Sequence, residues 1–363
     1  MIGALYAGGA ERQLAKLMKE LNKERFEVEI ASFYGTGSVG RDLELAGFHV
    51  HYFNPEVDIF NTNVKEGLLA TIKSFFELRK LIKKFKPMIV HSYLPYANLI
   101  SRFAVIGSHS KNISSIRVKE IGFSWHNIAD RLTRFLVKHY TTNSYTVKDF
   151  IHKKCKISLN KISVIRNGLN VKDFIPGLSK FSAKSLYGLQ SKKVVSMIAN
   201  LRDQKDHETL IDAISLLNNP GITCLLIGGG ANKESLMSYA KCNKNIVFCG
   251  ERKDIPELLN ATDVFVLSTF YEGSPNVLME AMAAQVPVVA SDIPEINEFL
   301  EHNVDALLVQ RDSNAMAKAI KNVLEDSALR TKLVRNSFSK VQLLFNIQQT
   351  TKKTQELYVQ TIL

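Results

Sequence analysis

Short runs of β-branched and other apolar residues alternate with amphipathic segments along all 363 residues, and this alternation restricts the fold most. Turn-forming residues separate the apolar runs from the segments with helical periodicity. Strands that alternate with helices form parallel sheets with helices on both faces. The pattern therefore predicts an α/β fold, and the length favours two domains over one compact core.

Six strands are predicted in each half of the chain. They span Val28–Tyr34, His49–Phe53, Met88–Tyr93, Ile113–Val118, Tyr140–Asn143, Ile162–Ile165, Val194–Ala199, Thr223–Gly228, Ile246–Cys249, Val264–Ser268, Val288–Ser291 and Ala306–Val309. Helices are expected between them, for example over Glu11–Asn22, Lys65–Phe85, Ala97–Ile106 and Tyr145–His152. The polar stretch Gly168–Lys193 contains Gly and Pro, so we expect it to join two Rossmann-like domains that face each other across a cleft.

The beginning of the chain is unusual for this fold. Only Ile2–Leu5 stands before the segment Ala7-Gly8-Gly9-Ala10-Glu11, which is typical of the first loop and helix. A doubly wound domain normally opens with a full strand at the centre of its sheet. We therefore expect a truncated first strand, as from a start codon assigned too late or from a trimmed chain.

The composition excludes several classes of protein. Hydrophobic residues make up 45% of the chain and charged residues 23%, values typical of a globular protein and not of a disordered or collagen-like one. No apolar stretch approaches the roughly 20 residues of a membrane-spanning helix. Cys155, Cys224, Cys242 and Cys249 form no C-x-x-C pair, so we expect buried thiols in a reducing compartment and no zinc site. No secretion signal opens the chain, which points to the cytoplasm.

The net charge of +12 lies entirely in the first half of the chain. Residues 1–170 contain 26 Lys and Arg against 14 Asp and Glu, whereas residues 171–363 contain 21 of each kind. A basic half can face nucleic acid, an anionic membrane or a phosphate-bearing substrate, or it can be a solvated surface that aids solubility. Nucleic acid is disfavoured, because the chain has no zinc-finger spacing, ribonucleoprotein motif or recognition helix.

The most basic segment is Lys65–Lys86, in which apolar residues recur near the helical period with lysines and an arginine between them. Such a helix can pack on a sheet, or it can lie in a lipid headgroup layer with its lysines on anionic lipid. We expect most of its apolar face to pack on the sheet.

The segment STFYEGSPNVLMEAMAA, residues 268–284, is the most informative about chemistry. It predicts a strand end, a loop and a helix that begins with Pro275 and is capped by Ser274. The free amides of a helix start form an anion site at the carboxyl end of a parallel strand, which suits a diphosphate. Glu272 and Glu280 would flank this site with carboxylates that accept hydrogen bonds from sugar or ribose hydroxyls. Taken alone, the same pattern also fits an ordinary strand, loop and helix with surface glutamates.

Two other loops follow predicted strands of the second half. Residues 199–207 carry Arg202 and Lys205, which can meet a departing diphosphate or belong to a solvated turn. Residues 248–255 indicate a strand end, a glycine and a capped helix start, which can offer backbone groups to a base edge. The triple glycine 228–230 does not fit the dinucleotide pattern G-x-G-x-x-G and predicts a structural turn.

Six segments in order resemble the retaining glycosyltransferases of family 4, which have the two-Rossmann GT-B architecture. They are Gly8–Glu11, Thr142–Ser144, Val164–Gly168, the Arg202–Lys205 loop, the Gly250–Ile255 turn and Glu272–Glu280. The resemblance covers essentially the whole chain apart from the start of the first strand. It implies an acceptor domain over residues 1–167, a nucleotide-sugar domain over 168–344 and a final helix over 345–363 that crosses back to the first domain.

The resemblance also implies a role for each site residue. Arg202 and Lys205 would hold the donor's diphosphate and stabilise the departing nucleotide, and Glu272 would contact the transferred sugar, so these three are the catalytic candidates. Glu280 would bind the ribose diol. The other binding candidates are loop and turn residues near the phosphates, sugar and base: Gly8, Gly9, Gly250, Arg252, Ile255, Gly273, Ser274, Pro275 and Asn276.

Two positions depart from the family pattern. Many members have a histidine where this chain has Tyr93, so His91 and Tyr93 are open candidates for the acceptor side, with a core role favoured for His91. Residues 291–295 stand where many relatives have glycines, which leaves the choice of donor sugar open.

The resemblance thus implies a retaining glycosyltransferase that moves a sugar from a nucleotide-diphosphate sugar, first of all a UDP-sugar, to a lipid-linked saccharide. The product would be a cell-surface polysaccharide, O-antigen or lipopolysaccharide. No metal or other cofactor is expected, because cations and a helix start replace a metal at the diphosphate. The expected partners are donor, acceptor and an anionic membrane surface, with the chain cytoplasmic and peripheral at the inner face of the membrane.

Other functions stay open on the residues alone. A sugar-nucleotide epimerase, a phosphorylase or a non-catalytic relative could share this fold. A nicotinamide-dependent dehydrogenase is the least favoured alternative.

Overall fold

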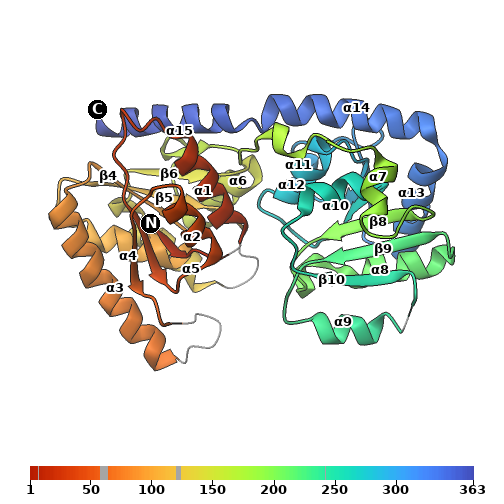
Figure 1. Ribbon diagram of the computed structural model, residues 1–363. Helices are drawn as coiled ribbons and strands as arrows, with labels where there is room; N and C mark the ends of the chain where they lie inside the picture. The colour runs from red at the N-terminus through yellow and green to blue at the C-terminus, as the bar shows by residue number, and fades with distance from the viewer. Residues whose placement is uncertain (7, 58–63, 120–123, 242) are drawn as a thin grey trace. The chain divides into compact units, whose positions relative to one another are not determined.

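The computed structural model describes residues 1–6, 8–57, 64–119, 124–241 and 243–363 and divides into two compact units (Figure 1). Unit 1 comprises Met1–Gly168 and Ile347–Leu363, and unit 2 comprises Leu169–Asn346. The sequence predicts the first boundary between residues 167 and 168 and the last helix from residue 345. Ala7 and Cys242, which enter the sequence predictions, lie outside the described residues.

Unit 1 contains a seven-stranded parallel sheet with the strand order β3-β2-β1-β4-β5-β6-β7. Its strands are β1 (Ile2–Ala4), β2 (Ile30–Tyr34), β3 (Val50–Asn54), β4 (Ile89–Tyr93), β5 (Lys111–Ile116), β6 (His139–Thr142) and β7 (Ile162–Val164). Its helices are α1 (Gly9–Glu20), α2 (Ser38–Leu45), α3 (Val64–Phe85), α4 (Pro95–Ala104), α5 (Trp125–Thr133), α6 (Tyr145–Cys155) and α15 (Ile347–Ile362), with short 3-10 turns at Arg134–Leu136 and Leu159–Lys161.

Unit 2 contains a six-stranded parallel sheet with the order β10-β9-β8-β11-β12-β13. Its strands are β8 (Lys193–Ile198), β9 (Ile222–Ile227), β10 (Ile246–Gly250), β11 (Val264–Leu267), β12 (Val288–Ser291) and β13 (Leu307–Val309). Its helices are α7 (Lys180–Ser185), α8 (His207–Leu217), α9 (Lys233–Tyr239), α10 (Ile255–Ala261), α11 (Asn276–Ala283), α12 (Pro294–Asn297), α13 (Ser313–Glu325) and α14 (Ser327–Leu344), with 3-10 turns at Val171–Phe174 and Asp203–Lys205.

The two doubly wound parallel sheets confirm the predicted α/β class. All predicted strands are present, with ends within two residues of the predicted ones. The largest shift is at β5, because this strand is rich in buried polar residues that a search for apolar runs passes over. Its Ser114 accepts a hydrogen bond from Nε of Arg102 (3.2 Å), and its Ser115 hydrogen-bonds to Nε2 of His91 (2.8 Å).

Helices cover both faces of the unit 1 sheet. Successive residues of a strand point to opposite faces, so neighbouring residues contact different helices. Ile30 packs with Leu17 of α1 in one apolar cluster, and the next residue, Ala31, packs with Leu78 of α3 in another. In unit 2 all side chains of β9 and β11 are buried. Near-continuous apolar strands of this kind are typical of parallel sheets buried on both faces.

The short first strand that the sequence predicts is present and lies at the centre of the unit 1 sheet. β1 is three residues long, and Ile2 pairs with Ser32 of β2 and with Tyr93 of β4. The loops that follow β1 and β4 therefore leave the same edge of the sheet side by side.

His91 belongs to the packing of unit 1, as the favoured interpretation of its sequence position expects. Its Nδ1 lies 2.7 Å from the Tyr358 hydroxyl of α15, and its ring stacks on Tyr93 at 4.5 Å. Burial, together with the positive charges of the amino terminus and Arg117, holds the pKa of His91 well below its usual range. The neutral ring of His91 therefore joins α15 to the sheet, because its two nitrogens contact the hydroxyls of Tyr358 and Ser115.

The described cysteines differ in exposure. Cys155 and Cys224 are buried, as expected, and burial raises the pKa of the Cys224 thiol. Cys249 is only half-buried, so the expectation of a buried thiol is wrong there. The reason is its place in β10, an edge strand of the unit 2 sheet whose side chains are incompletely covered.

Candidate functional site

The candidate site lies in unit 2, where the order of the strands reverses. β8 and β11 are neighbours; the chain runs outward from β8 through β9 and β10, and from β11 through β12 and β13 on the other side. Open α/β sheets bind ligands outside the carboxyl ends of their strands at such a switch point. Residues 199–206, which follow β8, and residues 268–275, which follow β11, form loops at this edge.

The structure brings Lys205 and Glu272, two of the three predicted catalytic residues, into direct contact. The ammonium group of Lys205 forms a salt bridge with Oε1 of Glu272. The side chain of Glu272 is 8% exposed and that of Lys205 is 18% exposed. A carboxylate this deeply buried is unfavourable without a partner charge, so each group depends on the other.

Hydrogen bonds join the two loops into one connected platform. Nε2 of Gln204 donates to the carbonyl oxygen of Tyr271 (2.7 Å), and the backbone N–H of Phe270 donates to the carbonyl oxygen of Gln204 (2.9 Å). The hydroxyl of Ser268 donates to the carbonyl oxygen of Asp206 (2.8 Å). The position of Lys205 is therefore set by the loop that carries Glu272.

Arg202, the third predicted catalytic residue, is exposed on this platform. Its guanidinium forms no hydrogen bond or ion pair within the described part of the chain. Its loop packs on the triple glycine, where the N–H of Leu201 donates to the carbonyl of Gly229 (2.8 Å). A Cβ on Gly230, at φ +154°, would lie 2.4 Å from the carbonyl oxygen of Leu201. Only glycine allows this close approach of the two segments.

The helix after β11 begins one residue later than predicted. α11 starts at Asn276, and Pro275 holds the capping position with an extended backbone (φ −73°, ψ 101°), so neither Pro275 as first helical residue nor Ser274 as cap is correct. Gly273 and these residues form the loop and first turn at the carboxyl end of β11. Glu280 lies about one turn further into α11 and is buried.

The Gly250–Ile255 turn lies after β10, two strands away from β8. Gly250 has φ +65°, a conformation that favours glycine. Nε of Arg252 donates to Oδ1 of Asp254 (2.8 Å), and this pairing, with a hydrogen bond from Tyr187, lowers the pKa of Asp254 to about 2. The predicted capping of the next helix is wrong, because Asp254 binds these side chains and makes no capping bond to α10.

Arg311 also lies at this edge, and no local sequence pattern marks it. Its guanidinium carbon is 3.7 Å from the ring centroid of Phe270, and its Nη1 is 3.3 Å from Oδ2 of Asp206. The signal that could have found Arg311 is its place just after β13, since ligand-binding residues gather at the carboxyl ends of parallel strands.

His207, the first residue of α8, is buried next to the platform. It is 2% exposed, and neither ring nitrogen has a hydrogen-bond partner among the described residues. Burial and the positive charge of Lys205 lower the pKa of His207 to about 4. The ring is therefore neutral at physiological pH.

Gly8 and Gly9 lie in unit 1 at the carboxyl end of β1, beside the switch point between β1 and β4. Gly8 caps α1, and Gly9 is the first residue of this helix. A Cβ on Gly8 would lie 2.1 Å from Oε2 of Glu11, so the glycine leaves room for this carboxylate. Burial raises the pKa of Glu11.

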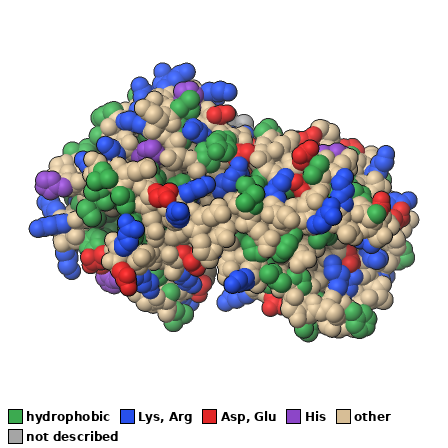
Figure 2. Space-filling view, turned by 90° about the horizontal axis from the view of Figure 1, so that it is seen from above, with side chains coloured by type: hydrophobic (Ala, Val, Ile, Leu, Met, Phe, Trp, Pro, Cys, Tyr) green, Lys and Arg blue, Asp and Glu red, His purple; other side chains and the backbone are tan. Residues whose placement is uncertain are grey.

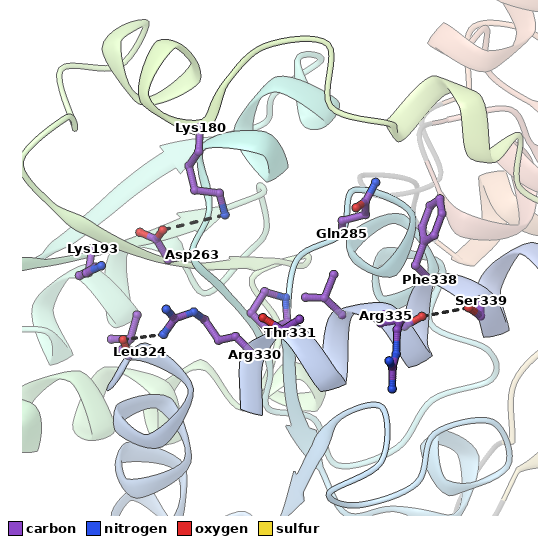
Figure 3. Close-up of a pocket in the computed structure, with 12 residues that line it drawn as sticks. Lys180, Lys193, Asp263, Gln285, Leu324, Arg330, Thr331, Arg335, Phe338 and Ser339 are labelled. Carbon is purple, nitrogen blue, oxygen red and sulfur yellow. Dashed lines mark hydrogen bonds and ion pairs between the residues drawn. The ribbon is translucent and has the colours of Figure 1, made fainter. Parts of the chain in front are cut away.

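A pocket of about 700 Å³ lies at the opposite, amino end of the unit 2 strands (Figure 3). Its lining includes Lys193, the first residue of β8, and Asp263, which directly precedes β11. Nζ of Lys180, another lining residue, lies 3.9 Å from Oδ1 of Asp263. None of the sequence-predicted site residues lines it.

Comparison with known protein families gives two matches. Residues 7–173 match Glycosyltransferase Family 4, and residues 192–326 match Glycosyl transferases group 1. The two matches together cover most of the chain.

Several curated relatives are bacterial glycosyltransferases. The UDP-Gal:alpha-D-GlcNAc-diphosphoundecaprenol alpha-1,3-galactosyltransferase of Escherichia coli is 28% identical over 324 residues, which cover 82% of this chain and 81% of that protein. The capsular polysaccharide biosynthesis glycosyltransferase CapM of Staphylococcus aureus is 24% identical, with coverage of 93% and 91%. An N,N'-diacetylbacillosaminyl-diphospho-undecaprenol alpha-1,3-N-acetylgalactosaminyltransferase of Campylobacter jejuni is 31% identical over 49% of each chain.

Solved structures confirm the predicted GT-B fold. HepE of Anabaena, solved with UDP and glucose, has a TM-score of 0.83 at 20% identity and covers 98% of this chain and 97% of its own. The lipopolysaccharide outer core galactosyltransferase WaaB has a TM-score of 0.72 at 16% identity, with coverage of 99% and 98%.

Proposed function

Because this chain belongs to the glycosyltransferases, with a family 4 domain followed by a group 1 domain, we propose that it acts on a lipid-linked saccharide. The reaction is transfer of a sugar from a nucleotide-diphosphate sugar during the synthesis of a cell-surface polysaccharide, with retention of the anomeric configuration. UDP-sugars are the first candidates, since the E. coli relative is named for UDP-Gal and a diphosphoundecaprenol-linked acceptor.

The observation that carries this proposal is the Lys205–Glu272 pair at the switch point of unit 2, beside the exposed Arg202. The donor offers adjacent phosphates and sugar hydroxyls, and the pair offers an ammonium group and a carboxylate that are already in contact. Arg202 and Lys205 bind the diphosphate, and Glu272 accepts hydrogen bonds from the sugar. Glu280 accepts hydrogen bonds from the ribose diol, and the Gly250–Ile255 turn receives the base.

In the reaction, the bond between the anomeric carbon and the diphosphate oxygen breaks, and its electron pair leaves with the nucleotide. The acceptor hydroxyl attacks the same face of the sugar and gives its proton to the departing phosphate. Negative charge therefore develops on the diphosphate. Arg202, Lys205 and the amides at the start of α11 stabilise this charge, so no metal is needed there.

Unit 1 binds the acceptor in this proposal, and the positive charge of residues 1–170 favours a lipid diphosphate. Gly8 and Gly9 let backbone amides approach a phosphate closely. Figure 2 shows Lys and Arg side chains spread over one face of the molecule with hydrophobic side chains between them.

A thermal-shift panel with UDP, GDP, ADP, CMP and NAD tests the donor site. UDP at about 100 times its Kd is expected to stabilise the protein by roughly 2.7 kcal/mol and to raise Tm by a few degrees, and the other nucleotides are expected to do less. Glu280→Gln is expected to reduce the UDP shift, because a neutral amide oxygen accepts hydrogen bonds from a diol less strongly than a carboxylate.

Glu325→Gln is the matched control for this panel, since Glu325 is exposed at the far end of α13. It should leave the UDP shift unchanged. If only another nucleoside diphosphate raises Tm, that nucleotide and not UDP is the one carried by the donor. Equal shifts for the wild type and Glu280→Gln would contradict the role of Glu280, and no shift with any nucleotide would contradict the donor site.

We also propose that unit 1 rests on an anionic membrane surface. Among the described residues no helix is long and apolar enough to cross a membrane. Part of the apolar face of α3 packs on the sheet as expected, with Leu78 and Ile82 buried, whereas Leu69 and Phe76 are 59% and 63% exposed. After α5, Phe135 is 75% exposed and has Arg134 next to it. Apolar side chains with cations beside them suit a lipid headgroup layer.

Vesicle flotation tests this membrane contact. The wild type is expected to float with anionic vesicles and much less with neutral ones, and Leu69→Ser/Phe76→Ser is expected to lose most of the anionic binding. The control is Leu343→Ser, which changes a leucine that is 67% exposed on α14 of unit 2. Equal flotation with both vesicle types would refute the attraction of unit 1 to anionic lipid. Unchanged flotation of the double variant would refute the proposal that α3 contacts the membrane.

A further inference from the structure

Glu29, His49 and His51 form a cluster at the amino end of two strands of unit 1, whereas Gly8 and Gly9 lie at the carboxyl end of β1. Glu29 directly precedes β2, and His49 directly precedes β3, the edge strand of the sheet. The register pairs Ile30 with Val50, so Glu29 stands opposite His49. His51 follows two residues later on the same face, because side chains alternate along a strand.

Both imidazole rings direct a nitrogen to one carboxylate oxygen. Nδ1 of His49 and Nε2 of His51 are each 2.8 Å from Oε2 of Glu29, and the ring centroids are 4.3 Å apart. The three ligand atoms all lie within 4.8 Å of one another. A tetrahedral ion with bonds of about 2.1 Å needs ligand atoms roughly 3.4 Å apart, so each histidine nitrogen must move about 0.6 Å farther from the Glu29 oxygen.

We propose that Glu29, His49 and His51 bind a divalent transition-metal ion of the Zn²⁺ type. Two imidazoles and one carboxylate are ligands that Zn²⁺ and Co²⁺ accept, whereas Mg²⁺ and Ca²⁺ prefer oxygen atoms alone. In the metal-free cluster each ring must present an N–H to the same oxygen. When an ion binds these two nitrogens, each imidazole carries its proton on its other ring nitrogen, and water fills the further coordination positions of the ion.

The surroundings of the cluster permit an ion to enter and give it a role. The side chain of His49 is 70% exposed, and those of Glu29 and His51 are each 25% exposed, so the ion reaches all three from solvent. Glu29 belongs to the β2 side and the histidines to the β3 side. A shared ion would therefore hold the edge strand β3 to its neighbour, and this role is independent of the proposed transferase activity.

Titration of the full chain with Co²⁺ tests the site. One equivalent is expected to give the visible absorption of a four- or five-coordinate Co²⁺ ion, which Zn²⁺ displaces and Mg²⁺ does not. His49→Ala and Glu29→Gln are each expected to weaken Co²⁺ binding more than about 100-fold, because each removes one of three ligands, whereas loss of a group that only supports a ligand costs about 10- to 100-fold.

The matched control is His109→Ala, which removes an exposed histidine of unit 1 that lies outside the cluster. It should bind Co²⁺ as the wild type does. Glu29→Gln keeps the size of the side chain, and His49 is largely exposed, so circular dichroism is expected to report both variants as folded. Wild-type affinity in both variants, a spectrum that survives in them, or no binding at millimolar Co²⁺ would overturn the proposal.

Discussion

Changing Lys205 to Ala is expected to reduce sugar transfer at least about 100-fold, the usual loss when one group that stabilises developing negative charge is removed. It is also expected to destabilise unit 2 by roughly 3 kcal/mol, because the Glu272 side chain, 8% exposed, loses its partner cation. Product formed per folded molecule measures the first effect, and urea unfolding measures the second.

A second substitution tests whether the loss of stability comes from the unpaired charge of Glu272. Glu272→Gln in the Lys205→Ala chain removes the unpaired charge, so we expect stability to return and transfer to stay low. Arg202→Ala is the matched control, because Arg202 is exposed and has no partner in the described part of the chain. It should lose transfer without losing stability. Near-full transfer by Lys205→Ala, or its recovery in the double variant, would show that Lys205 is only structural.

Acid pH is expected to destabilise unit 2 by about 3 kcal/mol through His207 alone. Each unit by which the pKa of His207 is lower in the folded chain than in the unfolded chain costs about 1.4 kcal/mol. The unfolded chain protonates this residue below pH 6.5, whereas burial and the charge of Lys205 hold its pKa near 4 in the folded chain. The contribution of His207 to the stability is therefore fully present above pH 6.5. It decreases as the pH falls to about 4 and does not change further below that.

His207→Leu tests this pH dependence, since leucine fills the buried position without a titratable group. Urea unfolding followed by circular dichroism from pH 7.5 to 4 should show a smaller loss of stability in this variant than in the wild type. Trp125, the only tryptophan, lies in unit 1, so its fluorescence reports that unit separately. His109→Leu should behave as the wild type does. An unchanged pH dependence in His207→Leu would contradict the account of His207.

Most of the fold could be predicted because buried parallel strands are short apolar runs, as β11 is from Val264 to Leu267. β5 departs from this rule: its buried Asn112, Ser114 and Ser115 are satisfied by hydrogen bonds to side chains of other elements, among them Arg102. Such partners become visible only in three dimensions.

The residues of the candidate site could also be predicted only in part. Lys205 and Glu272 could be found because each follows a predicted strand, but their ion pair depends on how two loops 67 residues apart join. Arg311 lies 105 residues from Asp206, and no local pattern connects them. The first residue of α11 is not fixed by the sequence alone, because Pro275 fits both a first helical position and a capping position, and only its ψ decides between them.

The metal-binding cluster shows why register matters. His49 and His51 share a strand face in any β-strand, but Glu29 joins them only because Ile30 pairs with Val50. A shift of this register by one residue would turn Glu29 to the other face of the sheet.

We expect the chain to transfer a sugar from a UDP-sugar to a lipid-linked saccharide. The most direct test incubates the purified chain with an undecaprenyl-diphosphate monosaccharide in anionic vesicles and a panel of UDP-hexoses and UDP-N-acetylhexosamines. Mass spectrometry of the lipid should show one added sugar residue with a single donor, and NMR should show the anomeric configuration of that donor. Donor that is consumed without any sugar on the lipid, or that is left untouched across the panel, would show that the chain does not catalyse this transfer.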